Sequence, residues 1–533
     1  MASSHRMLSY MPHGLFNLFV TFCVLFVRDV SCYKILFLPA LSTGSHYMYL
    51  AKIGEQLVHS GHNVTFLLGH YNDLRKNADH ERLFKVENYH TELDEDHFTK
   101  IKTTFISRAL RGQQRFEDAK LMSAPMLEDC KMLLRDIELF KRLETSKFDL
   151  VVLDNVAACS TLIAQKLVLP FVIASTNRPV PQVDANYLAI PTPISYVPAL
   201  QSGLSDQMTF VQRLQNLLMN VVVFYMFNFV MLKPYEELKQ QYNIQPHKTV
   251  QESLAGAEVA LFGVDWALEF PRPYMPNTVF IGGLLAKEPS PLKDEWKEFV
   301  DSADDGIVVF SFGGYANLAV DPEKAEIVTA ALARLPQKVV MRYEGQPPKS
   351  LGKNTKLAEW IPQNDLLGHP KTKAFVTHGG INGVYEAIFH GVPVVGIPLY
   401  GDHYDNFVRL SKKGMAVTLN VVTMTSAELH QAINMIIREP RYKENAMQLS
   451  RIHRDKPMPP VDTAVFWIEH VIKHGGQHLR AEAVNLNFVQ YFSLDVMAFL
   501  LVCLVLSIFL LKRVSSFVLG LCCKRSPRKE KIN

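Results

Sequence analysis

The sequence shows little imbalance of charge, with 56 lysine and arginine residues against 52 aspartate and glutamate residues and a formal net charge of +4. This balance indicates no nucleic-acid-binding surface, and no nucleic-acid partner is expected. Glycine and proline are few, with 27 and 29 among 533 residues, which excludes collagen-like and glycine- or proline-rich disordered classes. Because 48% of the residues are apolar and 20% are charged, the chain is expected to form large hydrophobic cores.

Several nucleotide-binding and catalytic motifs are absent. The sequence has no GxGxxG after an expected strand, no GxxxxGKS/T, no HExxH and no GxSxG. Dehydrogenase, kinase and serine-hydrolase functions therefore have no support from the sequence.

Two apolar segments place the chain in a membrane system. Residues 15–27 are uniformly apolar apart from two polar positions, which predicts a cleaved signal peptide over residues 1–32; an uncleaved anchor is the alternative, but this run is short for a span. Residues 492–511 form a second apolar run, and a basic tail follows over residues 512–533. The positive-inside rule then predicts a single-pass type I protein with a lumenal body and a cytosolic tail.

Cysteine is scarce, with seven residues in the whole chain. Four of them fall in the expected signal, span and tail: Cys23, Cys503, Cys522 and Cys523. Only Cys32, Cys130 and Cys159 remain for the lumenal body, so no disulfide framework is expected even in an oxidising compartment.

Strands and helices alternate through the lumenal body. A strand is expected at 34–39, a helix at 46–59 and a strand at 64–68, with a second such unit over 150–174. A further set follows the proline-rich residues 270–276, with strands expected at 279–281, 307–312, 338–342, 374–377 and 394–397. This alternation predicts the α/β class, with parallel sheets covered on both faces.

The length of the chain suits two large doubly wound domains of this kind. We expect an N-terminal domain over 33–255 and a C-terminal domain over 256–455, with ligands bound in the cleft where the sheets face each other. A crossing helix and a membrane-proximal segment would follow over 456–491. The apolar run 214–232 is expected to be a buried helix, with a helix on a membrane surface as the alternative.

The most informative stretch begins where the strand at 375–377 ends. Three residues, His378-Gly379-Gly380, form a glycine-rich loop, and Asn382 and Gly383 open a helix. Free backbone N–H groups and the positive end of the helix form an anion site there, and glycines let a phosphate approach the backbone.

Other polar residues of this stretch are expected around the same cleft. Glu386, expected in the first turn of the helix, would repel phosphates and suits a sugar hydroxyl. Asp402 and His403 lie on the loop after the next strand, and Trp360 is either a core residue or a platform for a base.

This ordered pattern resembles the signature of the family 1 UDP-glycosyltransferases, the group that contains UDP-glucuronosyltransferases and ceramide galactosyltransferase. The residues that carry the resemblance are Thr377, His378, Gly380, Glu386, Pro393, Pro398 and Asp402. It extends through 267–284, 308–313, 334–339 and 466–480. It implies the two-domain glycosyltransferase B architecture and transfer of a hexosyl or glucuronosyl group from a UDP-sugar to a hydroxyl of a lipophilic acceptor.

The resemblance also implies roles for individual residues. Trp360 and Gln363 would hold the uridine base and ribose, and Glu386 the ribose. The diphosphate would meet Ser311 and the stretch formed by His378, Gly380, Asn382 and Gly383, and the transferred sugar would meet Asp402 and His403. The helix at 466–480 would brace the first domain.

His46 lies where the first strand's loop meets a helix, in the sequence Gly44-Ser45-His46. The positive end of a helix disfavours imidazolium, so a neutral ring is expected. The resemblance implies that His46 is the general base and that Asp154 orients it, whereas alone they would be an exposed loop residue and a helix cap. The implied mechanism is a single inverting displacement that needs no metal or other cofactor.

The acidic run Asp94-Glu95-Asp96 is a DxD, which metal-dependent glycosyltransferases use to hold Mg²⁺ or Mn²⁺ under UDP. His90, Glu92 and His97 lie nearby, but the run is polar throughout. We interpret it as a solvated charged patch and expect no metal site.

The donor and the location of the protein follow from details of the resemblance. Most glucuronosyl and glucosyl members end the signature in Asp-Gln, whereas Asp402-His403 resembles ceramide galactosyltransferase. UDP-galactose or another neutral hexose donor is therefore favoured, with UDP-glucuronic acid as the alternative.

Lys529 and Lys531 resemble a dilysine signal for the endoplasmic reticulum membrane. A homo-oligomer is compatible with the sequence, and a non-catalytic protein that binds lipid or UDP-sugar is the remote alternative.

Overall fold

In the computed structural model, the described residues are 32–40, 42, 44–69, 78–91, 95–156 and 158–523. They form two compact units, one ending at Arg480 and one beginning at Ala481. The expected signal peptide up to residue 31 lies outside the described residues, as do Glu92 and Asp94 of the acidic run and the tail from residue 524.

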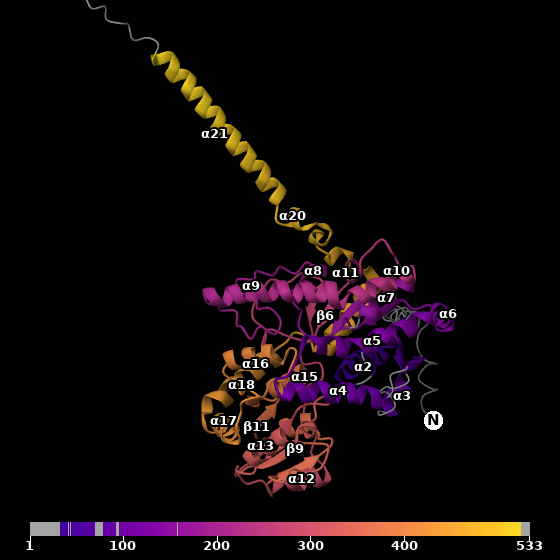
Figure 1. Cartoon of the computed structure of the whole chain (residues 1–533). Coiled ribbons are helices and arrows are strands. Elements are labelled where there is room, and N and C mark those ends of the chain that lie inside the picture. Colours follow the sequence, from indigo (N-terminus) through magenta and orange to yellow (C-terminus); the bar gives the residue numbers. More distant parts are fainter. Residues whose placement is uncertain are drawn as a thin grey trace, which may run out of the picture. The chain divides into compact units, whose positions relative to one another are not determined.

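The first unit contains a seven-stranded parallel sheet in the order β3-β2-β1-β4-β5-β6-β7; its strand β6 is labelled in Figure 1. Its strands are β1 (Lys34–Leu38), β2 (Asn63–Gly69), β3 (Lys85–Tyr89), β4 (Leu150–Leu153), β5 (Phe171–Ser175), β6 (Ala260–Phe262) and β7 (Thr278–Phe280). Its helices are α2 (Gly44–His59), α3 (Ala78–Leu83), α4 (Glu95–Leu110), α5 (Phe116–Arg135), α6 (Ile137–Ser146), α7 (Ala158–Lys166), α8 (Asp184–Tyr187), α9 (Phe210–Tyr225), the π-helix η3 (Met226–Met231), α10 (Lys233–Gln241) and α11 (Val250–Leu254).

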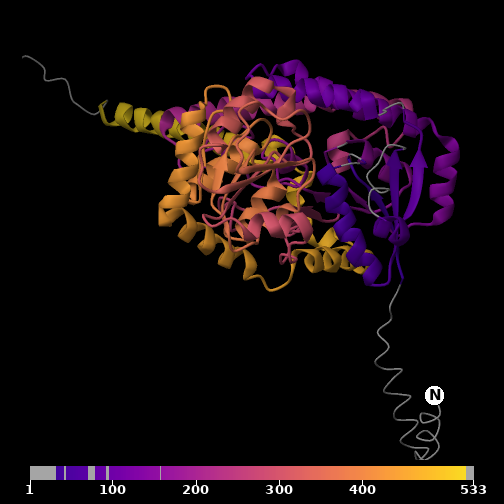
Figure 2. The same ribbon diagram turned by 90° about the horizontal axis from the view of Figure 1, so that it is seen from below.

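A second, six-stranded parallel sheet follows in the order β10-β9-β8-β11-β12-β13. Its strands are β8 (Ile307–Ser311), β9 (Lys338–Arg342), β10 (Thr355–Ala358), β11 (Thr372–Thr377), β12 (Val394–Gly396) and β13 (Ala416–Thr418). Its helices are α12 (Asp294–Asp301), α13 (Pro322–Leu332), α14 (Gln363–Leu367), α15 (Ile381–Phe389), α16 (His403–Lys412), α17 (Ser426–Arg438) and α18 (Pro440–Arg454). Figure 2 shows the indigo strands of the first sheet beside the orange elements of the second. The predicted α/β class with two parallel, helix-covered sheets is confirmed.

The strand expected at 279–281 was assigned to the second set, and this assignment is wrong. β7 pairs with β6, with Ala260 opposite Thr278, and is the edge strand of the first sheet. The proline-rich residues 270–276 are a loop between these two strands. The first sheet therefore extends beyond residue 255, and the second begins at β8.

The chain passes between the two sheets twice. It crosses once after β7 and returns between α18 and α19 (Pro460–His474), which packs on α2 through Ala464, Val465, Ile468 and Val471. The two crossings are bonded to each other near Asp265. This buried carboxylate accepts from the ring of His453 and, at 2.7 Å, from Lys456, which also donates to the carbonyl oxygen of Gly282 at 2.9 Å.

The apolar run 214–232 does not form the buried helix that was expected. It lies in α9 and η3, and Asn216 is the one buried side chain of these two helices. Apolar content alone predicted burial, but nine of these nineteen residues are exposed and eight are half-buried.

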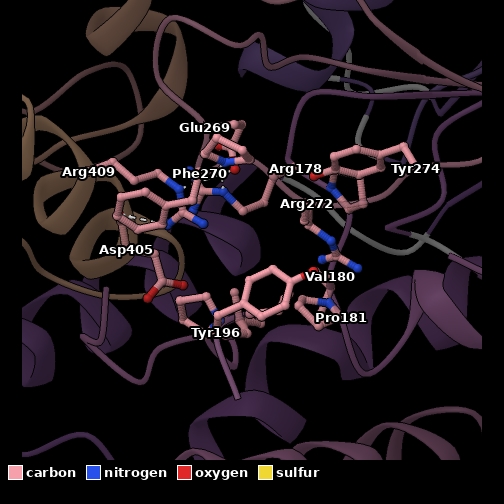
Figure 3. A pocket seen from close by; sticks show the side chains of 15 residues that line it. Arg178, Val180, Pro181, Tyr196, Glu269, Phe270, Arg272, Tyr274, Asp405 and Arg409 are labelled. Carbon is pink, nitrogen blue, oxygen red and sulfur yellow. Dashed lines mark hydrogen bonds and ion pairs between the residues drawn. The ribbon is translucent and has the colours of Figure 1, made fainter. Parts of the chain in front are cut away.

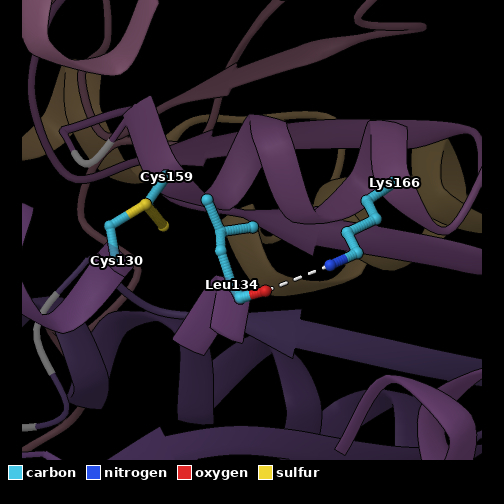
Figure 4. The surroundings of a disulfide bond; sticks show 4 residues. All are labelled: Cys130, Leu134, Cys159 and Lys166. Carbon is cyan, nitrogen blue, oxygen red and sulfur yellow. Dashed lines mark hydrogen bonds between the residues drawn. A yellow bond between two sulfur atoms is a disulfide. The ribbon is translucent and has the colours of Figure 1, made fainter. Parts of the chain in front are cut away.

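A disulfide joins Cys130 of α5 to Cys159 of α7, with the two Cα atoms 5.7 Å apart (Figure 4). The cysteine count argued against a framework of several bonds, but one bond needs only two neighbouring helices. The same pair of helices is linked again where Lys166 donates to the carbonyl oxygen of Leu134 at 3.2 Å. The structure thus adds a single bond that the cysteine count did not predict.

The second unit contains α20 (Phe488–Tyr491) and α21 (Leu494–Cys523). The segment Leu494–Leu521 is long and apolar enough to cross a membrane, and its most apolar part is not buried against the protein. The helix does not end at residue 511 as expected, since it continues through Lys512 and Arg513. The 28 residues of Leu494–Leu521 would extend about 42 Å at 1.5 Å per residue, more than the ~30 Å of a hydrocarbon core.

Replacement of Ile468 by Ala tests the packing of α19 on the first domain. Ile468 is fully buried among first-sheet residues, so the variant should lower the free energy of unfolding by about 2–4 kcal/mol. Phe466→Ala on the same helix is the control, because Phe466 is 49% exposed and should change stability by no more than about 0.5 kcal/mol. Urea unfolding of detergent-solubilised protein measures both; equal effects would contradict the packing.

Candidate active site

The carboxyl ends of β1 and β4 bring His46 and Asp154 together. Asp154 directly follows β4, its backbone N–H donates to the carbonyl oxygen of Leu38 at 3.1 Å, and α2 begins at Gly44. His46 Nδ1 lies 2.5 Å from Asp154 Oδ2. The other carboxylate oxygen of Asp154 accepts from the backbone N–H of Val156 at 3.1 Å. The carboxylate therefore both caps its own loop and holds the imidazole.

The environment of His46 differs from the expectation. Burial lowers the pKa of His46, but the nearby carboxylates of Asp154 and Asp402 raise it more, and the net pKa lies above the ordinary 6.5. The helix terminus alone predicts a lowered pKa, and the shift of the His46 pKa is in the opposite direction. Asp402 belongs to the loop before α16, so its charge reaches His46 from the other sheet's side.

The glycine-rich loop after β11 leads directly into α15. Gly379 has φ of +94°, and a Cβ there would lie 2.4 Å from the ring of Phe407, so this position requires glycine. Gly380 precedes α15, and Asn382 and Gly383 lie in its first turn. Glu386 lies in the second turn rather than in the first as expected, because the helix begins at Ile381.

The residues expected around a nucleoside are partly assembled. Gln363 Nε2, at the start of α14, donates to the carboxylate of Glu386. Burial raises the pKa of Glu386 to about 7. Trp360 is 74% exposed, and the guanidinium of Arg342 lies 5.9 Å from its ring centroid. Ser311 is buried at the end of β8, where its hydroxyl accepts from the backbone N–H of Gly313 at 3.2 Å.

His378 and His403 lie side by side, with ring centroids 4.5 Å apart in an edge-to-face arrangement. Burial lowers the pKa of His403 to about 3, and burial together with His403 lowers the pKa of His378 well below its ordinary value. Both rings are therefore neutral at physiological pH. The backbone N–H of Tyr400 donates to His403 Nδ1 at 3.4 Å, which leaves the ring proton on Nε2.

Asn406 fixes the carboxylate of Asp402. Its Nδ2 donates to Asp402 Oδ2 at 2.7 Å and to the carbonyl oxygen of Gly379 at 2.8 Å, and its Oδ1 accepts from Arg178. A single amide thus connects the loop before α16, the glycine-rich loop and the first domain.

Arg178 belongs to a buried cluster of charges that sequence reasoning missed (Figure 3). Its Nε donates to Glu269 at 3.0 Å, and Arg409 Nε donates to the other oxygen of Glu269 at 3.2 Å. The sequence did contain hints of this cluster. Arg178 and Glu269 follow β5 and β6 at the edge of the sheet, and Asn406 and Arg409 lie one and two helical turns after Asp402.

The charged cluster borders a cavity with about 470 Å³ of empty space, including the part open to solvent. The cavity is lined by residues from 178–200 and 269–274 together with Asp405 and Arg409. None of the predicted catalytic and donor-binding residues lines it. They lie instead at the carboxyl ends of β1 and β4 in the first sheet and of β8, β10, β11 and β12 in the second.

The chain matches the protein family described as "UDP-glucoronosyl and UDP-glucosyl transferase" over residues 33–529. It is similar to UDP-glucuronosyltransferase 2C1 of Oryctolagus cuniculus, with 41% identity over 501 residues that cover 91% of this chain and 99% of the relative. It is also similar to UDP-glucuronosyltransferase 2B17 of Homo sapiens, with 40% identity over 516 residues that cover 94% of this chain and 96% of the relative.

Solved structures share the fold. The glycosyltransferase of kitacinnamycin superposes with a TM-score of 0.58 at 18% identity and covers 83% of this chain and 99% of its own. Glycosyltransferase VinC in complex with DTDP superposes with a TM-score of 0.55 at 17% identity over 83% of this chain and all of its own. These neighbours confirm the expected architecture of two facing Rossmann-like domains.

The raised pKa of Glu386 predicts a pH dependence of stability. Since this pKa is about 7 in the folded state against an ordinary 4.5, the folded chain binds the proton more tightly. The free energy of unfolding should then fall as pH rises from about 4.5 to 7, by roughly 2–3 kcal/mol from this group. Glu386→Gln should remove that component, which urea unfolding of both proteins at pH 5 and pH 7.5 measures; identical pH profiles would contradict it.

Proposed function

Because the chain belongs to the family of UDP-glucuronosyl and UDP-glucosyl transferases, we propose that it transfers a sugar from a UDP-sugar to a hydroxyl of a lipophilic acceptor, with inversion at the anomeric carbon. Family membership makes it a UDP-glycosyltransferase and not the non-catalytic binding protein that was the alternative. The single observation that carries the proposed chemistry is the 2.5 Å contact between His46 and the buried Asp154.

In the proposed reaction, His46 removes the acceptor proton. Its Nδ1 is engaged by Asp154, so Nε2 is the nitrogen that faces the acceptor hydroxyl. The acceptor oxygen forms a bond to the anomeric carbon as the bond from that carbon to UDP breaks. The resulting imidazolium is stabilised by Asp154 and by the negative charge of Asp402, which already raise the pKa of His46.

Groups of the second domain would stabilise the negative charge that develops on UDP as it leaves. The helix α15 begins at Ile381, so the free backbone N–H groups of its first turn, around Asn382 and Gly383, would bind the diphosphate. The neutral His378 and the Ser311 hydroxyl are polar groups at the same strand ends. Trp360 would stack on the base, and Gln363 with Glu386 would bind the ribose. The proposed reaction uses neither a metal ion nor another cofactor.

For the donor, we favour UDP-galactose or another neutral hexose. His403 offers a neutral ring that donates through Nε2, and Arg178 is already paired with Glu269. A uronate carboxylate would compete with Glu269 for this cation. UDP-glucuronic acid is the second candidate, because the similar proteins from Oryctolagus cuniculus and Homo sapiens are glucuronosyltransferases.

We further propose residence in the endoplasmic reticulum membrane, with type I topology and a lumenal body. The disulfide between Cys130 and Cys159 supports an oxidising compartment for the first unit. The apolar helix α21 supports an anchor in membrane lipid, and Lys512 and Arg513 follow the most apolar part of it.

His46→Ala tests the proposed base. It should lower turnover by about 10²–10⁴-fold while UDP affinity remains nearly unchanged, because the base acts only on the acceptor. Asp154→Asn should cause a smaller loss, since the contact survives without its charge. UDP release and UDP binding by the solubilised protein measure these effects. His59→Ala, at the exposed end of the same helix, is the control. Wild-type turnover in a folded His46→Ala protein would remove His46 from the mechanism.

His403→Gln tests the donor proposal. The substitution replaces one ring N–H by an amide with a donor and an acceptor, so the preference among UDP-sugars should shift while UDP binding persists. A panel of radiolabelled UDP-galactose, UDP-glucose and UDP-glucuronic acid on microsomes measures it. Dominant glucuronate transfer by the wild type would overturn the neutral-hexose donor and favour the second candidate.

A further inference from the structure

The cavity beside the buried charge cluster is lined by five charged side chains: Arg178, Arg272, Arg409, Glu269 and Asp405. Three arginines against two carboxylates leave the lining with one excess positive charge. Glu269 already pairs with both Arg178 and Arg409. Because a charge removed from water requires a partner of opposite sign, the excess charge favours an anion in the cavity.

Arg272 is held in place by neutral groups. Its Nη2 donates to the carbonyl oxygen of Pro191 at 3.2 Å and to the hydroxyl of Thr192 at 2.8 Å. Burial lowers the pKa of Arg272, so its surroundings stabilise the charge less well than water does. An anion beside this guanidinium would replace the lost solvation.

Three polar atoms of the lining are buried without a hydrogen-bond partner among the described residues: Arg178 Nη1, Arg272 Nε and Asp405 Oδ1. Arg178 is 6% exposed and Asp405 4%. The other two nitrogens of Arg178 donate to Glu269 and Asn406, so Nη1 is the one left for an occupant. Buried polar groups in proteins are almost always hydrogen-bonded. The two arginine donors suit the anionic oxygens of a carboxylate or a sulfate, and the oxygen of Asp405 suits a hydroxyl or a water molecule beside them.

The rest of the lining is mostly aromatic or aliphatic. The ring centroid of Phe270 lies 4.8 Å from the guanidinium carbon of Arg409, and that of Tyr274 lies 5.2 Å from the guanidinium carbon of Arg272. Other lining residues of this kind include Val180, Pro181, Tyr196, Val197 and Leu200 (Figure 3). The empty space of about 470 Å³, including the part open to solvent, is of the size of small-ligand pockets. An occupant would therefore carry an apolar body beside its anionic group.

This cavity is separate from the proposed diphosphate site. It is lined by the loops after β5 and β6 of the first sheet and by α16 of the second. The proposed diphosphate site lies at the start of α15, and neither Ser311 nor His378 lines the cavity. An anion in the cavity is therefore a different ligand from UDP.

We propose that the cavity binds a lipophilic monoanion, with a carboxylate or sulfate group at Arg272 and at Nη1 of Arg178 and an apolar body against the aromatic side chains of the lining. The site goes beyond the proposed sugar transfer and does not depend on it.

A pair of isosteres tests the requirement for charge. Cinnamate and cinnamamide have the same apolar body, but only cinnamate is an anion. In equilibrium dialysis against the protein in a nonionic detergent, without UDP-sugar, cinnamate should bind at least roughly tenfold more tightly than cinnamamide, because hydrogen bonds between charged groups are stronger than neutral ones. Equal affinities would overturn the proposal. An absence of cinnamate binding would assign the unpaired donors to water and overturn it equally.

Competition with UDP separates the cavity from the donor site. Cinnamate should remain bound to the wild type when UDP is present at a saturating concentration. Complete displacement of cinnamate by UDP would assign its binding to the donor site and overturn the proposal.

Arg272→Gln locates the bound anion. The variant removes the positive charge but keeps an amide that can donate to Pro191 and Thr192, so cinnamate affinity should fall at least roughly tenfold while cinnamamide affinity is unchanged. Arg441→Gln is the matched control, because Arg441 lies on α18 with its side chain 64% exposed, and its cinnamate affinity should equal that of the wild type. Binding to detergent micelles is the same background for both variants. Equal cinnamate affinities of the two variants would overturn the proposal.

A photolabel on the unmodified protein removes any dependence on how the variants fold. The para isomer of benzoylbenzoate is a lipophilic monoanion whose ketone, when irradiated, inserts into nearby C–H bonds. It should label peptides that contain residues 178–200 or 269–274, and excess cinnamate should suppress this labelling. Labelling confined to other segments would overturn the proposal.

Discussion

The pairing of Arg178, Glu269 and Arg409 is the interaction on which the rest of the site depends. Buried charges are costly unless they are paired, and the loss of any one of them would leave the others uncompensated. Arg178 and Glu269 follow strands of the first sheet, whereas Arg409 lies on α16 of the second. In this conformation the charge pairing connects the two sheets, and Asn406 extends the connection to Asp402. The proposed sugar-binding carboxylate is thus oriented by charges outside the reaction.

The sequence predicted what is local and missed what depends on distant neighbours. His46 and Asp154 follow two strands of one parallel sheet, so their common edge could be predicted from the alternation of strands and helices, whereas their roles came from the family resemblance. The direction of the pKa of His46 could not, because Asp402 reaches it from the other sheet. The buried charge cluster was missed for the same reason: each member occupies an ordinary position in its own segment, and only the packing of two domains makes them partners.

Errors about the fold also arose where a local pattern has two physical outcomes. The apolar run in α9 predicted a helix correctly, but composition does not say which side of a helix meets the protein. The proline-rich residues 270–276 suggested a domain join, yet proline-rich loops also connect neighbouring strands such as β6 and β7. Cysteine counting excluded a network of disulfides but not the single bond between α5 and α7.

The double crossing of the chain, held together around Asp265, determines which domain motions are available. Two covalent connections that lie side by side act as the pin of a hinge, so the domains can rotate about that line but cannot drift apart or twist freely. Asp265, with its bonds to His453 and Lys456, lies at this axis. Opening would widen the far edge of the cleft most and the axis least. Large substrates would therefore enter and leave at the far edge, while residues near the axis keep their spacing through every cycle.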